Sequence, residues 1–229
     1  HQVRNNGTYY LMENEVTMAE IFNSHGFNTS AIIASFTVSS KFGLDQGFDF
    51  YDENFGSSEV AQNFKTEIAA DRVYEKFLSW LENNNDRKFF CWVHFYDPHF
   101  PYVFHDSYTA ENNRSLWGNY ESEIRYVDTY IGKIIDILKT KQLMDNTVIV
   151  IVGDQGEAFG EHGEYGHGIF CYEESLKVPL IIHNPLHVKE KRFITEKISL
   201  VDILPTVLEL HNFSIPKDIQ GKSLLTLIR

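Results

Sequence analysis

Residues 148–168 read VIVIVGDQGEAFGEHGEYGHG, and this stretch decides the fold class. It opens with an unbroken run of Val and Ile, which is typical of a strand buried on both faces, as in a parallel sheet. Glycines and polar side chains follow the run at once. In open parallel sheets, ligands bind beyond the carboxyl ends of the strands, because the loops converge there. The stretch therefore predicts an α/β fold with a ligand site directly after Val152.

Apolar runs and helical periodicities alternate along the rest of the chain. Strands are expected at residues 30–36, 89–95, 147–152 and 179–183. Helical spacing of apolar residues predicts helices within residues 17–26, 57–84, 120–142 and 199–212. The chain has no internal repeat, low-complexity block or obvious linker. We therefore expect residues 1–229 to form one domain, built on one doubly wound, mainly parallel sheet flanked by helices.

The composition excludes some classes of partner. The net charge is -12, from 32 acidic and 20 basic residues that are spread along the chain, so a nucleic acid or an anionic membrane surface is disfavoured. No apolar run approaches the roughly 18 residues of a membrane span. Cys91 and Cys171 match no zinc or redox spacing, and we expect both to be buried free thiols.

Asp154 and Gln155 are the first candidate site residues. They present adjacent oxygen donors at a strand end, and Gly153 and Gly156 leave room on either side for a close approach of backbone and ligand. Oxygen donors suit a hard cation such as Ca²⁺ or Mg²⁺, which takes about six or more ligands, so two residues cannot complete its shell. The alternative is that Asp154 caps the next helix or turn, and the sequence around this aspartate leaves both readings open.

A second polar cluster, HFYDPHFPY, follows the strand expected at residues 89–95. Two prolines make this loop rigid, which suits a residue that must meet a charged substrate group, and His99 is the candidate. The alternative is a surface histidine whose ring stacks on one of the aromatic residues after it. His94 falls inside the strand and is expected to be a hydrogen-bonded core histidine. Asp97 most simply starts the turn.

His167 is the third candidate. Gly166 and Gly168 flank it and leave its imidazole unshielded, and a histidine near a metal-bound oxyanion can donate a proton to a leaving group. Glu173 and Glu174 follow soon after, and their simplest interpretation is that of helix-end or loop charges in structural ion pairs.

Five segments in this order resemble the sulfatase family of the alkaline-phosphatase superfamily. They are FFCWVHFYDPHFPY, YVDTYIGKIIDIL, VIVIVGDQGEAFGEHGEYGHG, CYEESLKVPLII and VDILPTVLEL. The similarity covers essentially the whole chain, and five ordered motifs are far more specific than any one of them.

The resemblance implies an alkaline-phosphatase-like fold and a role for each candidate residue. Asp154 and Gln155 would bind a divalent cation, usually Ca²⁺, with Mg²⁺ and Mn²⁺ as the alternatives. His99 would contact the sulfate, and His167 would lie beside the ester oxygen. The implied substrate is a sulfate ester of a small molecule or a glycan. These positions coincide with those found from the residues themselves.

The chain also departs from the family pattern. Sulfatases use a formylglycine made from the Cys or Ser of a C/S-x-P-S-R motif, and neither Cys91 nor Cys171 stands in one. The aspartate pair of the family's first strand is absent, as are the Lys and His of its GKWHLG segment. Gln155 replaces a commoner His or Asn but keeps a carbonyl oxygen. We therefore expect a domain that lacks its first strand, a formylglycine encoded outside this chain, and no activity from this chain alone.

Two alternatives stay open. The same scaffold accommodates phosphoester or phosphonate-ester hydrolysis, and a chain without its nucleophile is also consistent with a non-catalytic remnant that binds an anion or a partner protein. The upstream sequence discriminates them, because a Thr or Ser as the direct nucleophile favours phosphorus, and C-x-P-S-R favours sulfur.

Overall fold

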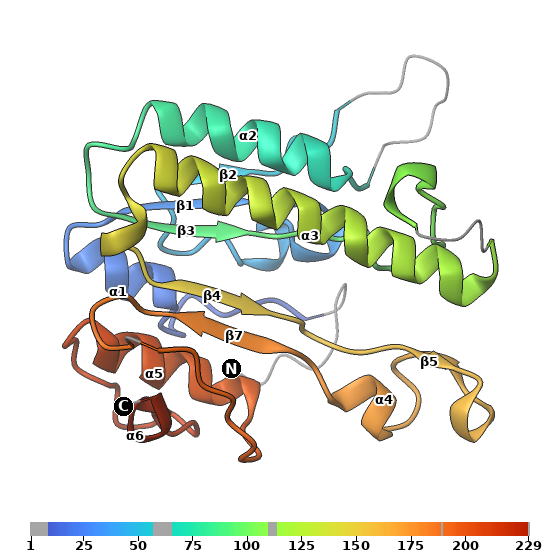
Figure 1. The fold of residues 1–229 in the computed structure, drawn as a ribbon. Helices are drawn as coiled ribbons and strands as arrows, with labels where there is room; N and C mark the ends of the chain where they lie inside the picture. Colours follow the sequence, from blue (N-terminus) through green and yellow to red (C-terminus); the bar gives the residue numbers. More distant parts are fainter. Residues whose placement is uncertain (1–8, 57–65, 110–113, 189, 229) are drawn as a thin grey trace. The chain divides into compact units, whose positions relative to one another are not determined.

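The computed structural model describes residues 9–56, 66–109, 114–188 and 190–228 (Figure 1). The chain divides into two compact units, His1–Lys141 and Gln142–Arg229. Both units combine helices and strands, so the predicted α/β class is confirmed. The first part of the helix predicted at residues 57–84 lies outside the described residues.

The first unit is built on a three-stranded parallel sheet. Its strands are β1 (Asn28–Ile32), β2 (Phe50–Asp52) and β3 (Phe89–Val93), in the order β2-β1-β3. The central strand is buried on both faces, and its Ala31 and Ile32 have no exposed surface. β1 lies earlier than predicted, because Phe36 enters a short 3-10 helix whose preceding Ser35 caps it.

Three α-helices pack in the described part of the first unit, and the sequence explains where they begin. They are α1 (Met18–Ser24), α2 (Ala70–Glu82) and α3 (Leu116–Thr140). A capping box starts α1: the Thr17 hydroxyl accepts from the Glu20 amide at 3.1 Å, and the Glu20 carboxylate accepts from the Thr17 amide at 2.7 Å. The Ser115 hydroxyl caps α3 by accepting from the amide of Gly118.

Helices α1 and α2 cover opposite faces of this sheet. The ring of Phe89 contacts Trp80 of α2, with centroids 5.6 Å apart, whereas the ring of Phe90 stacks on Phe22 of α1 at 4.8 Å. Successive residues of a strand point to opposite faces, so the two helices lie on either side. Helix α3 runs beside α2 (Figure 1), and they make side-chain contact.

The second unit contains two antiparallel strand pairs. β4 (Ile149–Val152) pairs with β7 (Leu180–His183), and β5 (Ala158–Phe159) pairs with β6 (Tyr165–Gly166). The helices of this unit are α4 (Glu173–Leu176), α5 (Ile203–Leu210) and α6 (Leu225–Ile228). The sequence predicted one mainly parallel sheet. β1 and β3 pair in parallel, as predicted, whereas β7 pairs antiparallel with β4 in a two-stranded sheet.

The connection between β4 and β7 explains this correction. A parallel neighbour needs a crossover, usually through a helix long enough to return along the sheet. Here the connecting residues form the β5–β6 hairpin, and their one described α-helix, α4, has four residues. Strand β7 therefore pairs with β4 in the opposite direction.

Short 3-10 helices complete the described elements. They are η1 (Phe36–Val38), η2 (Ser40–Phe42), η3 (Asp106–Tyr108), η4 (Met144–Asn146), η5 (Glu161–Gly163) and η6 (Leu200–Asp202). Pro205 lies in the first turn of α5, where its missing amide hydrogen costs no helical hydrogen bond.

Both cysteines are free thiols. Burial raises the pKa of Cys91, which lies in β3, to about 12. Cys171 is exposed, so the prediction that it is buried was wrong. Of the helices in the described ranges, none is both long and apolar enough to cross a membrane.

Candidate functional site

Asp154 and Gln155 follow β4 as the sequence predicted. Strand β4 ends at Val152, and both side chains are exposed at its carboxyl end. In the part of the chain that the structure describes, the Asp154 carboxylate makes no hydrogen bond or ion pair, so it caps no described helix or turn. Its oxygens are accordingly available to a ligand.

Neighbouring residues of the chain, rather than a ligand, occupy the space beside the flanking glycines. A Cβ atom added to Gly156 would lie 2.0 Å from the carbonyl oxygen of Glu174, and the Gly156 amide donates to the carbonyl of Ser175 at 2.9 Å. A Cβ atom on Gly153 would lie 3.3 Å from Cδ of Pro179. The sequence therefore identified sites of close approach correctly, but the protein's own chain fills the space.

The β5–β6 hairpin brings Glu157 to His167. Ala158 lies opposite Gly166, so the preceding and following residues, Glu157 and His167, face each other across the hairpin. Nδ1 of His167 is hydrogen-bonded to Oε1 of Glu157. The Glu157 side chain is only 5% exposed, and that of His167 is 25% exposed. Sequence reasoning missed Glu157, whose signal was the hairpin register rather than a motif.

Glu157 and Gln155 together define the hydrogen-bond roles of the His167 ring. The carboxylate of Glu157 can only accept, so Nδ1 carries the hydrogen and Nε2 of the neutral ring is an acceptor. Nε2 lies 2.6 Å from Nε2 of Gln155, so the amide NH₂ of Gln155 donates to it. This orientation leaves Oε1 of Gln155 for a cation or a substrate.

The arrangement constrains what His167 can do. Both of its ring nitrogens are engaged, one by a carboxylate and one by an amide. To deliver a proton from Nε2 to a leaving group, the ring must first be protonated there, and the Gln155 amide must turn away or present its oxygen.

His99 lies in a loop of the first unit that leaves the carboxyl end of β3. Its ring stacks on Tyr96, with centroids 4.4 Å apart, and its amide donates to the Asp97 carbonyl at 2.7 Å. This aromatic neighbour precedes His99 in the sequence. His94 is hydrogen-bonded as expected: its amide donates to Ile32, and its Nδ1 accepts from the amide of Ala34 at 3.2 Å.

Two buried carboxyl groups anchor this loop. Oδ1 of Asp97 accepts from the Ala70 amide at 3.0 Å and so caps α2, whose own N-cap residue has no side-chain acceptor. Oε1 of Glu123 accepts from the amide of Val103 at 2.9 Å. Asp97 therefore does more than start a turn, and the sequence gave no sign of the Glu123 contact.

Burial shifts both of these carboxyl groups toward the protonated form. It raises the pKa of Asp97 to about 6 and that of Glu123, which is 3% exposed, to about 8, and the two charges also repel each other. The second oxygen of each group is buried without a hydrogen-bond partner in the described ranges, which suits a protonated carboxyl.

The other polar side chains near His167 in the sequence have local roles. His162 stacks on Tyr172 with centroids 4.2 Å apart, and its Nε2 lies 3.9 Å from Oε1 of Glu174. Glu173 and Glu174 occupy the first turn of α4, which confirms their interpretation as helix-end charges. The second unit thus brings Gln155 and His167 into contact, and the sharing of one site with His99 of the first unit stays a prediction.

The donors at the end of β4 fit a hard cation in kind but not in number. Asp154 offers a carboxylate, and Gln155 offers an amide oxygen that its contact with His167 leaves uncommitted. No group of three or more His, Cys, Asp or Glu side chains that could hold a metal ion occurs within the described ranges. A full shell would need ligands beyond these two.

A family model described as Sulfatase matches residues 2–213. The chain belongs to the sulfatase family. This sulfatase chain is 30% identical to arylsulfatase K of the mouse, Mus musculus, over 186 residues that cover 77% of the chain and 31% of that protein. It is 26% identical to the ulvan-active sulfatase of Formosa agariphila over 267 residues, which cover 96% of the chain and 51% of that protein.

Solved structures share the fold of this sulfatase chain. A protein solved in complex with its substrate D-glucosamine-2-N,6-O-disulfate aligns with a TM-score of 0.71 at 20% identity, over 98% of the chain and 66% of that protein. A phosphonate monoester hydrolase from Silicibacter pomeroyi aligns with a TM-score of 0.80 at 18% identity, over 98% and 63%. These likenesses show the alkaline-phosphatase-like α/β fold.

The chain spans about a third of the mouse relative and half of the Formosa relative. The activity, substrates and partners of a whole sulfatase are therefore matters of proposal for this chain.

Proposed function

We propose that this chain forms most of a catalytic domain that hydrolyses a sulfate ester of a small molecule or a glycan. The observation that carries the proposal is the match to the sulfatase family over residues 2–213, and the hydrogen-bonded chain Gln155–His167–Glu157 supports it. A glycan is supported by two likenesses: the neighbour solved with a sulfated glucosamine, and an N-acetylglucosamine-6-O-sulfatase of Bacteroides thetaiotaomicron. The latter is 38% identical over 106 residues, 46% of this chain and 19% of that protein.

Asp154 and Gln155 would hold a divalent cation, with Ca²⁺ first and Mg²⁺ or Mn²⁺ as alternatives. The carboxylate of Asp154 and Oε1 of Gln155 are the hard oxygen donors that such ions prefer, and both are uncommitted in the described ranges. When bound, the cation supplies positive charge next to the sulfate oxygens, where negative charge develops.

His99 would bind the sulfate group, and His167 would protonate the leaving oxygen of the ester. His99 would donate hydrogen bonds to sulfate oxygens from a ring held by stacking on Tyr96. Once its ring is protonated at Nε2 and the Gln155 amide has turned away, His167 would deliver that proton to the ester oxygen, while Glu157 accepts from Nδ1 and stabilises the charged ring. Glu157 is thus a positioning residue.

The nucleophile would come from outside this chain. In the net reaction, the sulfur–oxygen bond of the ester breaks, the oxygen of a water molecule ends on sulfur, and the alcohol oxygen takes a proton. The attacking group would be a formylglycine in a segment that this chain does not contain. In this proposal residues 1–229 form one catalytic domain, since the reaction uses His99 of the first unit and Asp154 of the second.

Phosphonate-ester hydrolysis is the second candidate, because the phosphonate monoester hydrolase shares the fold. The test co-expresses this chain with a sulfatase segment that carries the C-x-P-S-R motif and with a formylglycine-generating enzyme. Rates are then compared for 4-nitrophenyl sulfate, 4-nitrophenyl phosphate and 4-nitrophenyl phenylphosphonate, which share one leaving group. We expect the sulfate to have the highest kcat/KM. A higher kcat/KM for either phosphorus ester would contradict sulfate-ester hydrolysis and favour the second candidate function.

A further inference from the structure

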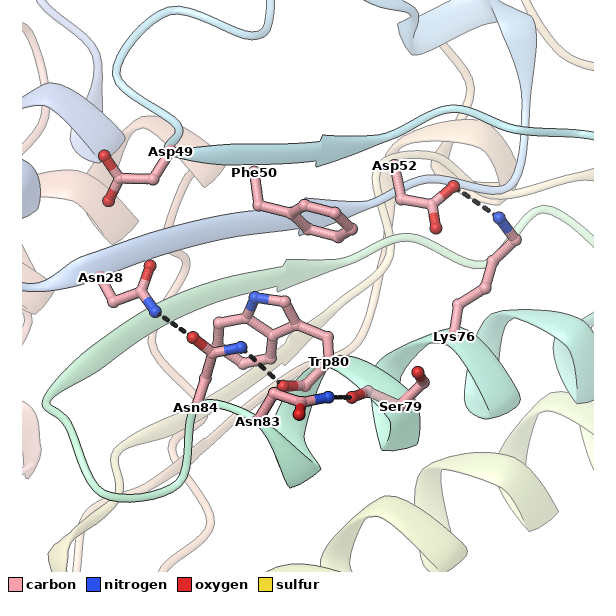
Figure 2. Close-up of a pocket in the computed structure, with 9 residues that line it drawn as sticks. All are labelled: Asn28, Asp49, Phe50, Asp52, Lys76, Ser79, Trp80, Asn83 and Asn84. Carbon is pink, nitrogen blue, oxygen red and sulfur yellow. Dashed lines mark hydrogen bonds and ion pairs between the residues drawn. The ribbon is translucent and has the colours of Figure 1, made fainter.

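A pocket of about 410 Å³ lies in the first unit, away from the loop that carries His99. It is formed beside the edge strand β2 and the carboxyl half of α2 (Figure 2). Asn28 begins β1 and Asn84 follows α2, so this end of the pocket lies at the amino ends of the strands. The loop of His99 leaves the opposite, carboxyl end of β3. The volume of the pocket falls in the range of about 300–1,000 Å³ that small-molecule sites occupy. The lining residues are Asn28, Asp49, Phe50, Asp52, Lys76, Ser79, Trp80, Asn83 and Asn84.

Three asparagines give one end of the pocket a fixed set of amide groups. The side-chain amide of Asn28 donates to Oδ1 of Asn84 at 2.6 Å. The amides of Asn84 and Asn83 in turn donate to the carbonyls of Trp80 and Ser79, at 2.7 and 2.9 Å. These bonds orient the side chains, and Oδ1 of Asn28 and Oδ1 of Asn83 accept no hydrogen bond within the described ranges. Asn28 and Asn83 therefore each add a neutral acceptor to the lining of the pocket, which also includes Ser79.

The charges of the pocket are already neutralised or satisfied. Nζ of Lys76 forms an ion pair with Oδ1 of Asp52 at 2.5 Å, and the two side chains are only 23% and 17% exposed. Asp49 accepts hydrogen bonds from the Thr29 backbone amide at 2.9 Å and from the amide of Asn23 at 2.8 Å. The hydrogen bond from the Thr29 amide is the largest of several causes that lower the pKa of Asp49, so the Asp49 carboxylate stays ionised. With its one cation paired and a net negative charge, the pocket disfavours an anion.

An aromatic ring separates the asparagine end from the ion pair. Figure 2 shows Phe50 between Asn28 and Asp52, and 42% of its surface is exposed. A single exposed ring is ordinary on a protein surface, but a ring that lines a pocket offers an apolar face to whatever binds there. The ligand must then combine an apolar face for Phe50 with uncharged hydrogen-bond donors for the amide oxygens.

We propose that this pocket is an accessory binding site for an uncharged sugar ring of a glycan. A pyranose has C–H groups on its ring face, which would stack on Phe50, and hydroxyl groups at its rim, which would donate to Oδ1 of Asn28 and Oδ1 of Asn83. The hydroxyl of Ser79 and the unused hydrogens of Lys76 would serve sugar oxygens as donors. The proposal does not depend on hydrolysis, because it concerns binding alone.

The test uses amide NMR spectra of the 229-residue chain titrated with four neutral probes: the methyl glycosides of glucose, galactose, mannose and N-acetylglucosamine. We expect at least one probe to give saturable shifts at the amides of Phe50 and Asn83. Phe50→Ala and Asn83→Ala should each weaken that binding about threefold to tenfold, the size of one aromatic contact or one hydrogen bond. Phe193→Ala, which removes an 84% exposed ring in the second unit, is the matched control and should bind as the unchanged chain does.

The results divide cleanly. Because Asn83 is exposed, its variant keeps the test valid if Phe50→Ala fails to fold. The proposal is overturned if no probe gives saturable shifts at the pocket, or if a folded variant binds as tightly as the unchanged chain. It is also overturned if sodium sulfate shifts the same amides at lower concentrations than every sugar does, because the pocket would then be an anion site.

Discussion

His167 lies between a buried carboxylate and an amide, and this placement gives its two ring nitrogens different roles. Glu157 accepts at Nδ1, and Gln155 donates at Nε2. The same contact turns Oε1 of Gln155 away from the histidine and leaves it for a cation. A single hydrogen-bonded chain therefore couples the candidate cation ligand to the candidate proton donor.

The first prediction concerns the tautomer of His167. We expect ¹⁵N NMR at a pH where the ring is neutral to show the hydrogen on Nδ1, because a carboxylate acceptor selects that tautomer. Glu157→Ala should shift the population toward the Nε2 tautomer, which predominates in free imidazole side chains. Glu209→Ala is the control, since Glu209 is exposed on α5. A neutral ring with its hydrogen on Nε2 in the unchanged chain would contradict the proposed roles.

The second prediction concerns sulfate binding by His99. Loss of one charged hydrogen bond costs about 1.5–3 kcal/mol, so His99→Ala should weaken the affinity for inorganic sulfate about tenfold or more. Calorimetric titration of both variants and the unchanged chain at one fixed pH measures this. His25→Ala removes an exposed histidine at the end of α1 and should have no effect. Equal sulfate affinity of His99→Ala and His25→Ala would show that His99 does not bind sulfate and is only a stacked surface histidine.

Among single residues, the sequence identified those that follow a strand end and missed those that strand pairing brings together. Asp154 and Gln155 follow an apolar run directly, so their placement could be predicted. Glu157 is separated from His167 by ten positions, and only the pairing of Ala158 with Gly166 brings them together.

Among the elements, the loop after β3 is held at both ends by buried carboxyl groups. Asp97 fastens it to the start of α2, and Glu123 of α3 fastens it to Val103. This attachment explains how a loop can hold His99 in place. The sequence predicted the strand and the two prolines, but a contact between a helix and a loop twenty residues apart leaves no local pattern.

The third prediction is a pH dependence of stability that originates in Glu123. Its pKa rises from 4.5 to about 8 on folding, so between these values the native protein holds a proton that the unfolded chain releases. The stabilisation is complete below pH 4.5 and is lost as the pH rises through 8. The free energy of unfolding should therefore fall between pH 5 and 8, as measured by urea denaturation.

Two variants isolate this contribution. Glu123→Gln keeps a neutral acceptor for the Val103 amide and should flatten the pH profile. Glu121→Gln, which changes a side chain 46% exposed on the same helix, should leave the slope unchanged. A slope that survives Glu123→Gln in full would show that other groups cause it, with Asp97 as the next to test.

For the whole molecule, the alternation of strands and helices was enough to predict the α/β class, and the direction of β7 was not predictable in the same way. Direction depends on what the connecting residues do, and a hairpin with a four-residue helix reads much like a crossover in sequence. Five ordered motifs gave the family, which the family match confirms. The joining of both units into one working domain remains a prediction.

The central claim is that this chain supplies the cation ligands and the histidines of a sulfatase but not its nucleophile. The most direct measurement is hydrolysis of 4-nitrophenyl sulfate with saturating Ca²⁺. It is made with the 229-residue chain alone and then with the chain co-expressed with a segment that carries the C-x-P-S-R motif and a formylglycine-generating enzyme. We predict no turnover by the chain alone, and turnover by the complemented protein that Asp154→Ala abolishes and that Asp218→Ala, an exposed control, preserves. Calcium-dependent turnover by the isolated chain, lost in Asp154→Ala, would contradict the claim.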